Sequence, residues 1–345
     1  MIALFALLAS QTTTVQQVDG ILTHAVRDSN LPSIAAAFVL DGKVVLKKTY
    51  GVKTLGKTDA PNDDTVYGIG STSKAMTAFG LMILVDQGKL NLNDPVGNYL
   101  PKLPESWKPI KVINFLTHTS GLPDGRLQDA KGKDTWEQFS NWAASHPIKF
   151  KPGTDQQYSN LNFAVAGQLI EQVSKTKYLS FMQTEVWGPL RMSRTGSWVE
   201  KLNGNMASPY MGPSNRLAKV GVNVVPAGIP SGGLVSSLND MLAWEEAMRE
   251  RRLLNPGTYE EMFTPVIPPQ SKAIWHFSPG WQVRRGNKMT VIAKNGSVQG
   301  YMSMIQMVPE RGAAIILLWN VQNPKASMWK ECATIWNQVL GIPLR

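Results

Sequence analysis

The pattern of hydrophobic and polar positions predicts strands near both ends of the chain and helices between them. After Thr14, apolar residues recur at helical spacing, which predicts an amphipathic helix; they are Val15, Val18, Ile21, Leu22 and Val26. Two β-rich runs follow, at 33–40 and 43–50. Asp41-Gly42 lies between these runs and is a strong signal for a β-hairpin.

Helical patterns dominate the middle of the chain. The segment 71–87 is apolar on nearly every side, which is typical of a buried helix. Residues 89–100 contain Asp94-Pro95 and are predicted to form a loop. Further helices are predicted at 113–116, 136–144, 159–173 and 178–186, with Pro and Gly in the gaps.

The last third of the chain returns to strands. After a predicted helix at 238–251, strand-like runs stand at 281–284, 290–293, 301–308 and 313–319. The turn 309–312 joins the last two, and a closing helix is predicted at 326–340.

These patterns predict two parts, an α/β part and an all-α part. Residues 14–70 and 237–345 together are expected to form an α/β sheet domain, because the predicted strands all lie in these two segments. Residues 71–236 are expected to form a mainly helical domain inserted between them. An active site is expected between the two parts, where clefts tend to form.

The N-terminus carries a short apolar run. Residues 1–9 read MIALFALLA, which is too short to span a bilayer and is similar to the hydrophobic part of a signal peptide. No Lys or Arg precedes this run, since the first one in the chain is Arg27. We therefore expect residues 1–13 to be a partial signal peptide and the protein to be periplasmic or secreted, with no integral membrane span.

Composition and charge exclude several classes of function. Among 345 residues, 43% are hydrophobic and 17% are charged, as in globular proteins. The net charge is +10, but Lys and Arg are spread along the chain without a basic stripe, so nucleic-acid binding is not predicted. The densest basic cluster is Arg249, Arg251 and Arg252. Acidic residues alternate with it, which favours a solvated helix face.

Metal and cofactor sites are not predicted either. The single cysteine, Cys332, excludes an intrachain disulfide and a metal site with several Cys ligands, and it is interpreted as a core residue. The four histidines do not fall in metal-binding spacings, and no nucleotide-binding glycine motif is present. We expect no cofactor.

The first candidate for chemistry is the pair Ser71 and Lys74. A strand-like run ends at Tyr67, two glycines follow, and Ser71 is predicted to begin a helix. Residues three positions apart share a helix face, so Lys74 can approach the Ser71 hydroxyl and act as its base if burial or a neighbouring cation lowers the lysine pKa. The same spacing also occurs at 174–177 and 327–330, and alone it fits an N-cap serine followed by a solvated lysine equally well.

The second candidate is Tyr158-Ser159-Asn160, which precedes an apolar helical segment. The Tyr158 phenol can share or relay the Ser71 proton. The Asn160 amide offers a donor and an acceptor to a substrate or to Lys74. The alternative is a plain helix start with Ser159 or Asn160 as its cap.

The third candidate is the tetrapeptide Lys294-Asn295-Gly296-Ser297, which follows the strand-like run 290–293. A lysine at a strand end can place a cation beside the cleft, where it lowers the pKa of Lys74 and attracts a substrate carboxylate. The backbone N–H groups of Ser297 and Ser71 can pair as an oxyanion hole. The alternative is an ordinary hairpin turn.

Together, these motifs resemble those of the serine β-lactamase and penicillin-binding-protein superfamily. Tyr158-x-Asn160 stands in place of S-D-N, which is similar to class C β-lactamases, D-alanyl-D-alanine carboxypeptidases and family VIII carboxylesterases of the peptidase family S12 type. The segments 116–123 (LTHTSGLP) and 231–237 (SGGLVSS) also resemble this group.

The resemblance implies a β-lactamase/transpeptidase-like fold, with an antiparallel sheet flanked by helices and an inserted helical domain. It implies an acyl-enzyme on Ser71, proton transfer by Lys74 and Tyr158, and substrate binding or electrostatic roles for the remaining motif residues, Asn160, Lys294, Asn295 and Gly296. His118 is then expected to be structural.

The implied substrate is a small ester, amide or peptide. Asn295 stands where class C enzymes carry Thr, which argues against efficient β-lactam binding. Esterase-type activity is the leading expectation. A D-alanyl-D-alanine carboxypeptidase, a D-aminopeptidase or a β-lactamase is the alternative within the same chemistry. A non-catalytic peptidoglycan-binding protein is the alternative of another class.

Overall fold

The computed structural model describes residues 2–124, 136, 140–141, 144–198, 204–269, 271–286, 289–322 and 327–341, with only the backbone of residues 2–13. A seven-stranded sheet runs in the order β2-β1-β12-β11-β10-β9-β8, and every neighbouring pair in it is antiparallel. Its strands are β1 (Ser33–Leu40), β2 (Lys43–Gly51), β8 (His276–Ser278), β9 (Trp281–Arg285), β10 (Thr290–Val298), β11 (Tyr301–Val308) and β12 (Ala313–Trp319). Chain-terminal strands thus meet in one sheet, as the hydrophobic pattern predicts.

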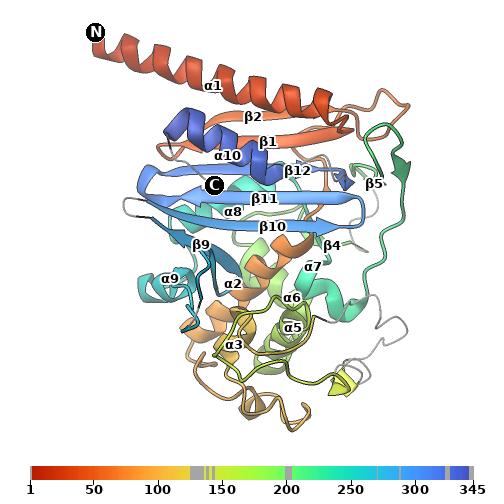
Figure 1. Ribbon diagram of the computed structural model, residues 1–345, viewed down its shortest axis with the longest axis vertical. Coiled ribbons are helices and arrows are strands. Elements are labelled where there is room, and N and C mark those ends of the chain that lie inside the picture. Colours follow the sequence, from red (N-terminus) through yellow and green to blue (C-terminus); the bar gives the residue numbers. More distant parts are fainter. Residues whose placement is uncertain are drawn as a thin grey trace.

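Both faces of the sheet are covered by helices, as Figure 1 shows. On one face, α1 (Ile2–Asp28) and α10 (Met328–Ile335) share an apolar cluster with Phe38 and Trp319. On the other face, α8 (Leu238–Arg249) and the helical part share a larger cluster with Ala37 and Leu318. Successive residues of a strand point to opposite faces, so the buried central strands are apolar without alternation.

The helical part lies below the sheet in Figure 1 and has α2 at its centre. It includes α2 (Ser73–Asp86), α3 (Val112–Leu116), α5 (Leu161–Ser174), α6 (Tyr178–Met182) and α7 (Ile229–Gly232). From Ser73 to Leu84, every residue of α2 is buried. Of the predicted helix 136–144, residues 136, 140, 141 and 144 are helical, and the other five lie outside the described residues.

Several element boundaries differ from the prediction. The helix predicted after residue 14 begins at Ile2, and the closing helix ends in a π-helical turn at Trp336–Leu340. The helix α9 (Pro256–Phe263) was not predicted. Most important for the site, β10 continues to Val298, whereas the apolar pattern predicts its end at residue 293. The polar tetrapeptide 294–297 stays in the strand because it pairs with β11 residue by residue.

Two predicted turns are confirmed. Asp41 and Gly42 both have positive φ, at 50° and 72°, which suits the tight two-residue connection between β1 and β2. The connection between β11 and β12 is a 3₁₀ turn, Pro309–Arg311, followed by Gly312 with φ 48°.

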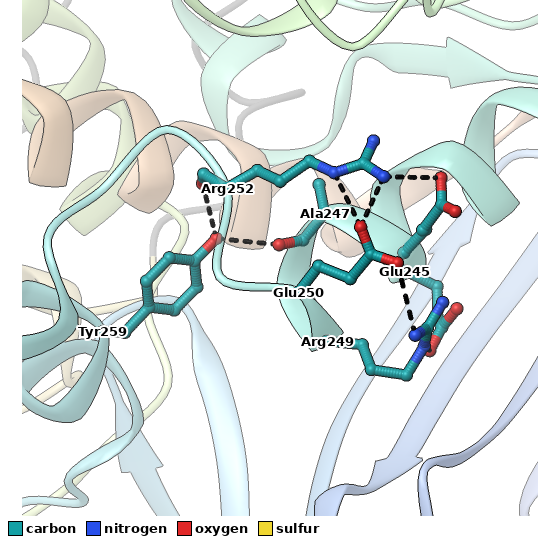
Figure 2. Close-up of polar contacts among 7 residues, drawn as sticks. Glu245, Ala247, Arg249, Glu250, Arg252 and Tyr259 are labelled. Atoms are coloured by element: carbon teal, nitrogen blue, oxygen red, sulfur yellow. Dashed lines mark hydrogen bonds and ion pairs between the residues drawn. The ribbon is translucent and has the colours of Figure 1, made fainter. Parts of the chain in front are cut away.

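Charged residues at and just after the end of α8 form a network, shown in Figure 2, and the Tyr259 hydroxyl of α9 donates to the Ala247 and Arg252 carbonyls beside it. The Arg252 guanidinium lies 2.5 Å from Glu250 and 3.3 Å from Glu246. Arg249 lies 3.3 Å from Glu245, whose side chain is only 3% exposed. Burial raises the pKa of Glu245 to about 7, while Arg249 opposes the shift. The prediction of a solvated helix face is therefore wrong for Glu245, because its carboxylate lies on the buried side of α8.

Among the described residues, the structure contains no helix with the length and apolar character needed to cross a bilayer.

A single buried amide connects the N-terminal and C-terminal strands. The Asn320 side chain, which follows β12, accepts hydrogen bonds from the backbone N–H and hydroxyl of Ser33 at 2.8 Å each. Its amino group donates to the carbonyls of Ser208 at 2.8 Å and Lys53 at 3.2 Å. Local sequence does not reveal this connection, because its four partners lie in three distant segments.

We predict that Asn320→Ala lowers the free energy of unfolding by about 2–4 kcal/mol, because it leaves buried donors and acceptors unpaired. Urea denaturation, followed by tryptophan fluorescence, measures the shift of the midpoint. Asn93→Ala, on an exposed loop, is the matched control and should leave the midpoint within error of wild type. An equal midpoint for Asn320→Ala would contradict the role of this amide.

Candidate active site

Ser71 lies in a tight 3₁₀ turn, not at the start of the helix as predicted. The turn, η1, spans Gly70–Thr72, and α2 begins at Ser73. Gly70 has φ +50°, and a Cβ added to it would come within 2.6 Å of the Ser297 nitrogen. Glycine adopts this conformation without strain, and any side chain here would collide with β10, so Gly70 allows β10 to lie this close to the nucleophile. The turn therefore places Ser71 beside β10, two residues before the start of α2.

A second glycine completes this close approach from the opposite side. A Cβ added to Gly296 would lie 1.9 Å from the Ile69 carbonyl oxygen. The Ser303 hydroxyl donates to that same carbonyl oxygen at 2.6 Å. Gly70 and Gly296 together hold η1 and β10 at backbone contact distance, which brings the first and third predicted motifs together.

Lys74 is completely buried and its amine points at Ser71. The Nζ lies 3.2 Å from Ser71 Oγ, 2.8 Å from Asn160 Oδ1 and 2.5 Å from the carbonyl oxygen of Ser231. Burial lowers the pKa of Lys74 well below its usual value, and the positive charge of Lys294 lowers it further, against an opposing effect of Asp124. The geometry and the electrostatics both favour a neutral amine beside the serine hydroxyl.

Tyr158 reaches the same hydroxyl from the turn before α5. Its phenolic oxygen lies 2.6 Å from Ser71 Oγ and 3.4 Å from Asn160 Oδ1. Its ring lies 4.9 Å from Lys74 Nζ. Burial raises the pKa of Tyr158 and the negative charge of Asp124 adds to this effect, while the hydrogen bond with Ser71 opposes it. The same burial that lowers the pKa of Lys74 thus favours the neutral, protonated phenol of Tyr158.

Lys294 is 2% exposed and lies behind Tyr158, not at the cleft surface. Its ammonium lies 5.9 Å from the Tyr158 ring and 5.8 Å from the Phe277 ring. Burial lowers the pKa of Lys294 to about 7. Two roles were predicted for this lysine, and its position favours the electrostatic one over direct contact with a substrate carboxylate.

The remaining residues of the third motif divide between the cleft and the sheet. Ser297 is exposed at the cleft, and its Oγ accepts from Gln322 Nε2 at 2.9 Å. Asn295 pairs with Met304 of β11 and does not line the cleft. Ser71, Tyr158, Asn160 and Ser297 of the predicted site residues therefore line the cleft, and the other four do not; these are Lys74, Lys294, Asn295 and Gly296.

A cleft of about 200 Å³ opens beside the Ser71 hydroxyl. Asn160, Ser231 and Ser297 contribute polar groups, and Val224, Val225 and Val298 contribute apolar surface. The other lining residues are Tyr158, Asn223, Gly228, Gly232 and Gln299. Within the described part of the chain, no charged side chain lines this cleft.

His118 is buried behind the Tyr158 ring, with ring centroids 4.5 Å apart. Its Nδ1 lies 3.1 Å from the Ser159 backbone nitrogen and 3.1 Å from Asn162 Nδ2. The backbone donor makes Nδ1 an acceptor, so the proton of the neutral ring is on Nε2. Burial lowers the pKa of His118, and the charges of Lys294 and Lys74 add to this effect. This position fits the expected structural role and not that of a base for Ser71.

Two contacts at the site were missed in the sequence. The Ser231 carbonyl accepts from Lys74, and Asp124 accepts from the backbone N–H and the side-chain amide of Asn160 at 3.2 Å each. A backbone acceptor leaves no signal in the residue type, although Ser231 begins a segment that resembles the superfamily. Asp124 directly follows the segment 116–123, which also resembles the superfamily, and this adjacency is the one sequence feature that points to Asp124. The described residues contain no group of three or more His, Cys, Asp or Glu side chains suited to a metal ion.

We predict that Lys294→Met shifts the acidic limb of the pH–rate profile to higher pH. The protonated Lys294 disfavours protonation of Lys74, so removing this charge raises the pKa of Lys74 and demands a higher pH for the neutral amine. The measurement is kcat/KM for an ester between pH 5 and pH 10. Lys89→Met, at an exposed position after α2, serves as the control. An unmoved acidic limb in Lys294→Met would show that Lys294 does not tune Lys74.

Known proteins are similar to this chain in sequence and in fold. The family model described as "Beta-lactamase" matches residues 18–331. "Protein flp" of Staphylococcus aureus (strain N315) is 25% identical over 323 residues, which cover 89% of this chain and 63% of that protein. A "Beta-lactamase" of Yersinia enterocolitica is 24% identical over 366 residues, covering 93% of this chain and 91% of that protein.

A solved structure gives the same result for the fold. The octameric penicillin-binding protein homologue from Pyrococcus abyssi superposes with a TM-score of 0.79 at 24% identity, covering 95% of this chain and 77% of that chain. The chain spans less than two thirds of the length of the staphylococcal relative, and the family model matches residues 18–331 of this chain. The resemblance read from the three motifs is thereby confirmed: the chain belongs to the Beta-lactamase family and has the β-lactamase/transpeptidase fold.

Proposed function

We propose that this protein is a serine hydrolase that forms an acyl-enzyme on Ser71 and cleaves esters or amides, with esterase-type activity. One observation carries the proposal. The Ser71 hydroxyl lies within hydrogen-bond distance of both a buried lysine amine and a protonated phenol, at 3.2 Å and 2.6 Å. Covalent catalysis needs a nucleophile that contacts a proton acceptor and a proton donor, and here both contact Ser71 Oγ.

The hydrogen bonds around Lys74 are consistent with its role as the base. A neutral amine has two N–H groups and one lone pair. The N–H groups are directed to the Ser231 carbonyl and to Asn160 Oδ1, which leaves the lone pair for the Ser71 hydroxyl proton. The Tyr158 hydroxyl then donates to Ser71 Oγ. In this arrangement every polar hydrogen of the three catalytic groups has an acceptor.

Acylation follows from this arrangement. The Ser71 proton passes to Lys74 as Oγ attacks the substrate carbonyl carbon, and the carbonyl oxygen becomes an oxyanion. The backbone N–H groups of Ser71 and Ser297, both at the cleft, are proposed to stabilise it. When the carbon–oxygen or carbon–nitrogen bond breaks, the leaving group receives the proton from Lys74 through Tyr158.

Deacylation repeats the same steps with water. A water molecule gives its proton to Lys74 and attacks the acyl carbonyl, and Ser71 Oγ leaves and recovers that proton. The ammonium formed on Lys74 is buried near Lys294, so it is more acidic than an exposed lysine and returns its proton more readily. The net reaction consumes one water and releases one acid and one alcohol or amine.

The cleft supports neutral esters as the preferred substrates. Its described lining combines valine side chains with amide and hydroxyl groups and carries no charge. A carboxylate transferred from water into such a site would lose solvation without gaining an ionic partner. Lys294, the nearest buried cation, lies behind the Tyr158 ring. This argues against recognition of a C-terminal carboxylate as the main source of affinity.

We predict that a fluorophosphonate probe labels the wild-type protein and does not label Ser71→Ala. The probe forms a phosphorus–oxygen bond with an activated serine and releases fluoride, so labelling needs the nucleophile but no particular substrate. Ser73→Ala, two residues away and hydrogen-bonded to the Gly70 carbonyl, controls for general disturbance and should keep labelling. Equal labelling of wild type and Ser71→Ala, or none in either, would refute the assignment. The second result would also favour a non-catalytic binding protein.

We predict that p-nitrophenyl esters of short acids are hydrolysed with higher kcat/KM than nitrocefin or a D-alanyl-D-alanine peptide. The uncharged cleft accommodates a small neutral acyl group and lacks a cation for the carboxylate of the other two substrates. All three substrates are assayed in parallel with wild type and Ser71→Ala. Activity on the peptide or nitrocefin alone would overturn the esterase proposal and leave the nucleophile assignment intact.

A further inference from the structure

The segment from His118 to Asp124 is hydrogen-bonded along its length to the turn that carries Tyr158 and Asn160. At its start, the His118 carbonyl accepts from Gln157 N at 2.9 Å. In the middle, Ser120 Oγ donates to Asn162 Oδ1 at 2.6 Å. Near its end, the Pro123 carbonyl accepts from Ser159 Oγ at 2.8 Å. The two segments therefore form one unit, and the position of Tyr158 depends on both.

Asp124 ends this unit and contacts Asn160. One carboxylate oxygen, Oδ1, accepts from both the backbone N–H and the side-chain amide nitrogen of Asn160, at 3.2 Å each. An amide group has a donor end and an acceptor end. Because the donor end faces Asp124, the acceptor end, Oδ1, faces Lys74 Nζ at 2.8 Å. If the Asn160 amide were reversed, its NH₂ group would face the N–H groups of the Lys74 amine.

We propose that Asp124 is a positioning residue of the acyl-transfer site, which fixes the orientation of the Asn160 amide and thereby the orientation of the Lys74 amine. The inference rests on the proposed function and extends it to a residue with no contact to Ser71. Asp124 is exposed, so its carboxylate contacts solvent on one side and the Asn160 amide on the other.

The charge of Asp124 has a second consequence that can be measured. Among the described residues, the titratable groups around Lys74 are Lys294 from β10, Tyr158 from the turn before α5, His118 from the segment after α3, and Asp124. Within this set Asp124 is the acidic side chain that affects the pKa of Lys74, and it favours the protonated amine. Removing this charge should allow Lys74 to lose its proton at lower pH.

Two substitutions separate orientation from charge. Asp124→Asn keeps an oxygen acceptor for Asn160 and removes the charge, so it should move the acidic limb of the pH–rate profile to lower pH by about 0.5–1 pH unit while keeping most of the plateau rate. Asp124→Ala removes the acceptor as well, so its plateau rate should fall about 10- to 100-fold, in kcat more than in KM. Asp155→Asn, an exposed carboxylate whose recorded contact is with the adjacent Gln156 N–H, is the matched control.

The measurement is the rate constant of fluorophosphonate labelling between pH 5 and pH 10, with kcat and KM for an ester in parallel and melting temperatures for all variants. The proposal would be overturned if both Asp124 variants had the same acidic limb of the pH–rate profile and the same plateau rate as wild type. A lower melting temperature of the Asp124 variants with an unchanged acidic limb of the pH–rate profile would also overturn it, because that result assigns Asp124 a structural role only.

Failure of the proposed function gives a different result. If wild-type protein is not labelled, the pKa of Lys74 is followed by ¹⁵N NMR of its Nζ, assigned by its loss in Lys74→Arg. A lower Lys74 pKa in Asp124→Asn than in wild type would then still support the inference, and an equal pKa would still refute it.

Discussion

The burial of two lysine side chains at one site is the constraint on which the rest of the structure depends. Lys74 is 0% exposed and Lys294 is 2% exposed, and no ion pair to a carboxylate is recorded for either among the described residues. A protonated amine in such surroundings loses its hydration without recovering it from an anion. The pKa of each lysine therefore falls, well below its usual value for Lys74 and to about 7 for Lys294, and the neutral amine is favoured.

A neutral amine is a useful base only if its lone pair points at the nucleophile. Three segments far apart in the sequence supply this orientation: η1 with the start of α2, the turn before α5, and α7 with its Ser231 carbonyl. The close contact of Gly70 with Ser297 and of Gly296 with Ile69 fixes the fourth side of the site. Because both contacts are between backbones, any side chain at either glycine would separate β10 from Ser71.

The sequence predicts the fold and most of the site, but with informative errors. The pairing of N-terminal and C-terminal strands follows from hydrophobic runs, and Ser71 and Lys74 follow from spacing and motif order. Spacing alone carries little information. Ser327 of the 327–330 pair is an ordinary helix N-cap that accepts from Lys330 N, and Ser174 of the 174–177 pair bonds to the Ile170 carbonyl. The difference lies in tertiary surroundings, which also hide the Ser231 carbonyl, Asp124 and the extension of β10 to Val298.

In the proposed mechanism Lys74 accepts a proton and Tyr158 donates one, and these different roles follow from the same burial. Low polarity penalises whichever form of a group is charged, so it stabilises the neutral phenol and the neutral amine at once. It therefore raises the pKa of Tyr158 and lowers that of Lys74, which makes the lysine the acceptor of the Ser71 proton and the phenol its donor partner. Lys294 strengthens this separation from behind the Tyr158 ring. In the proposed mechanism this lysine acts on Lys74 from outside the cleft, and so the described residues that line the cleft carry no charge.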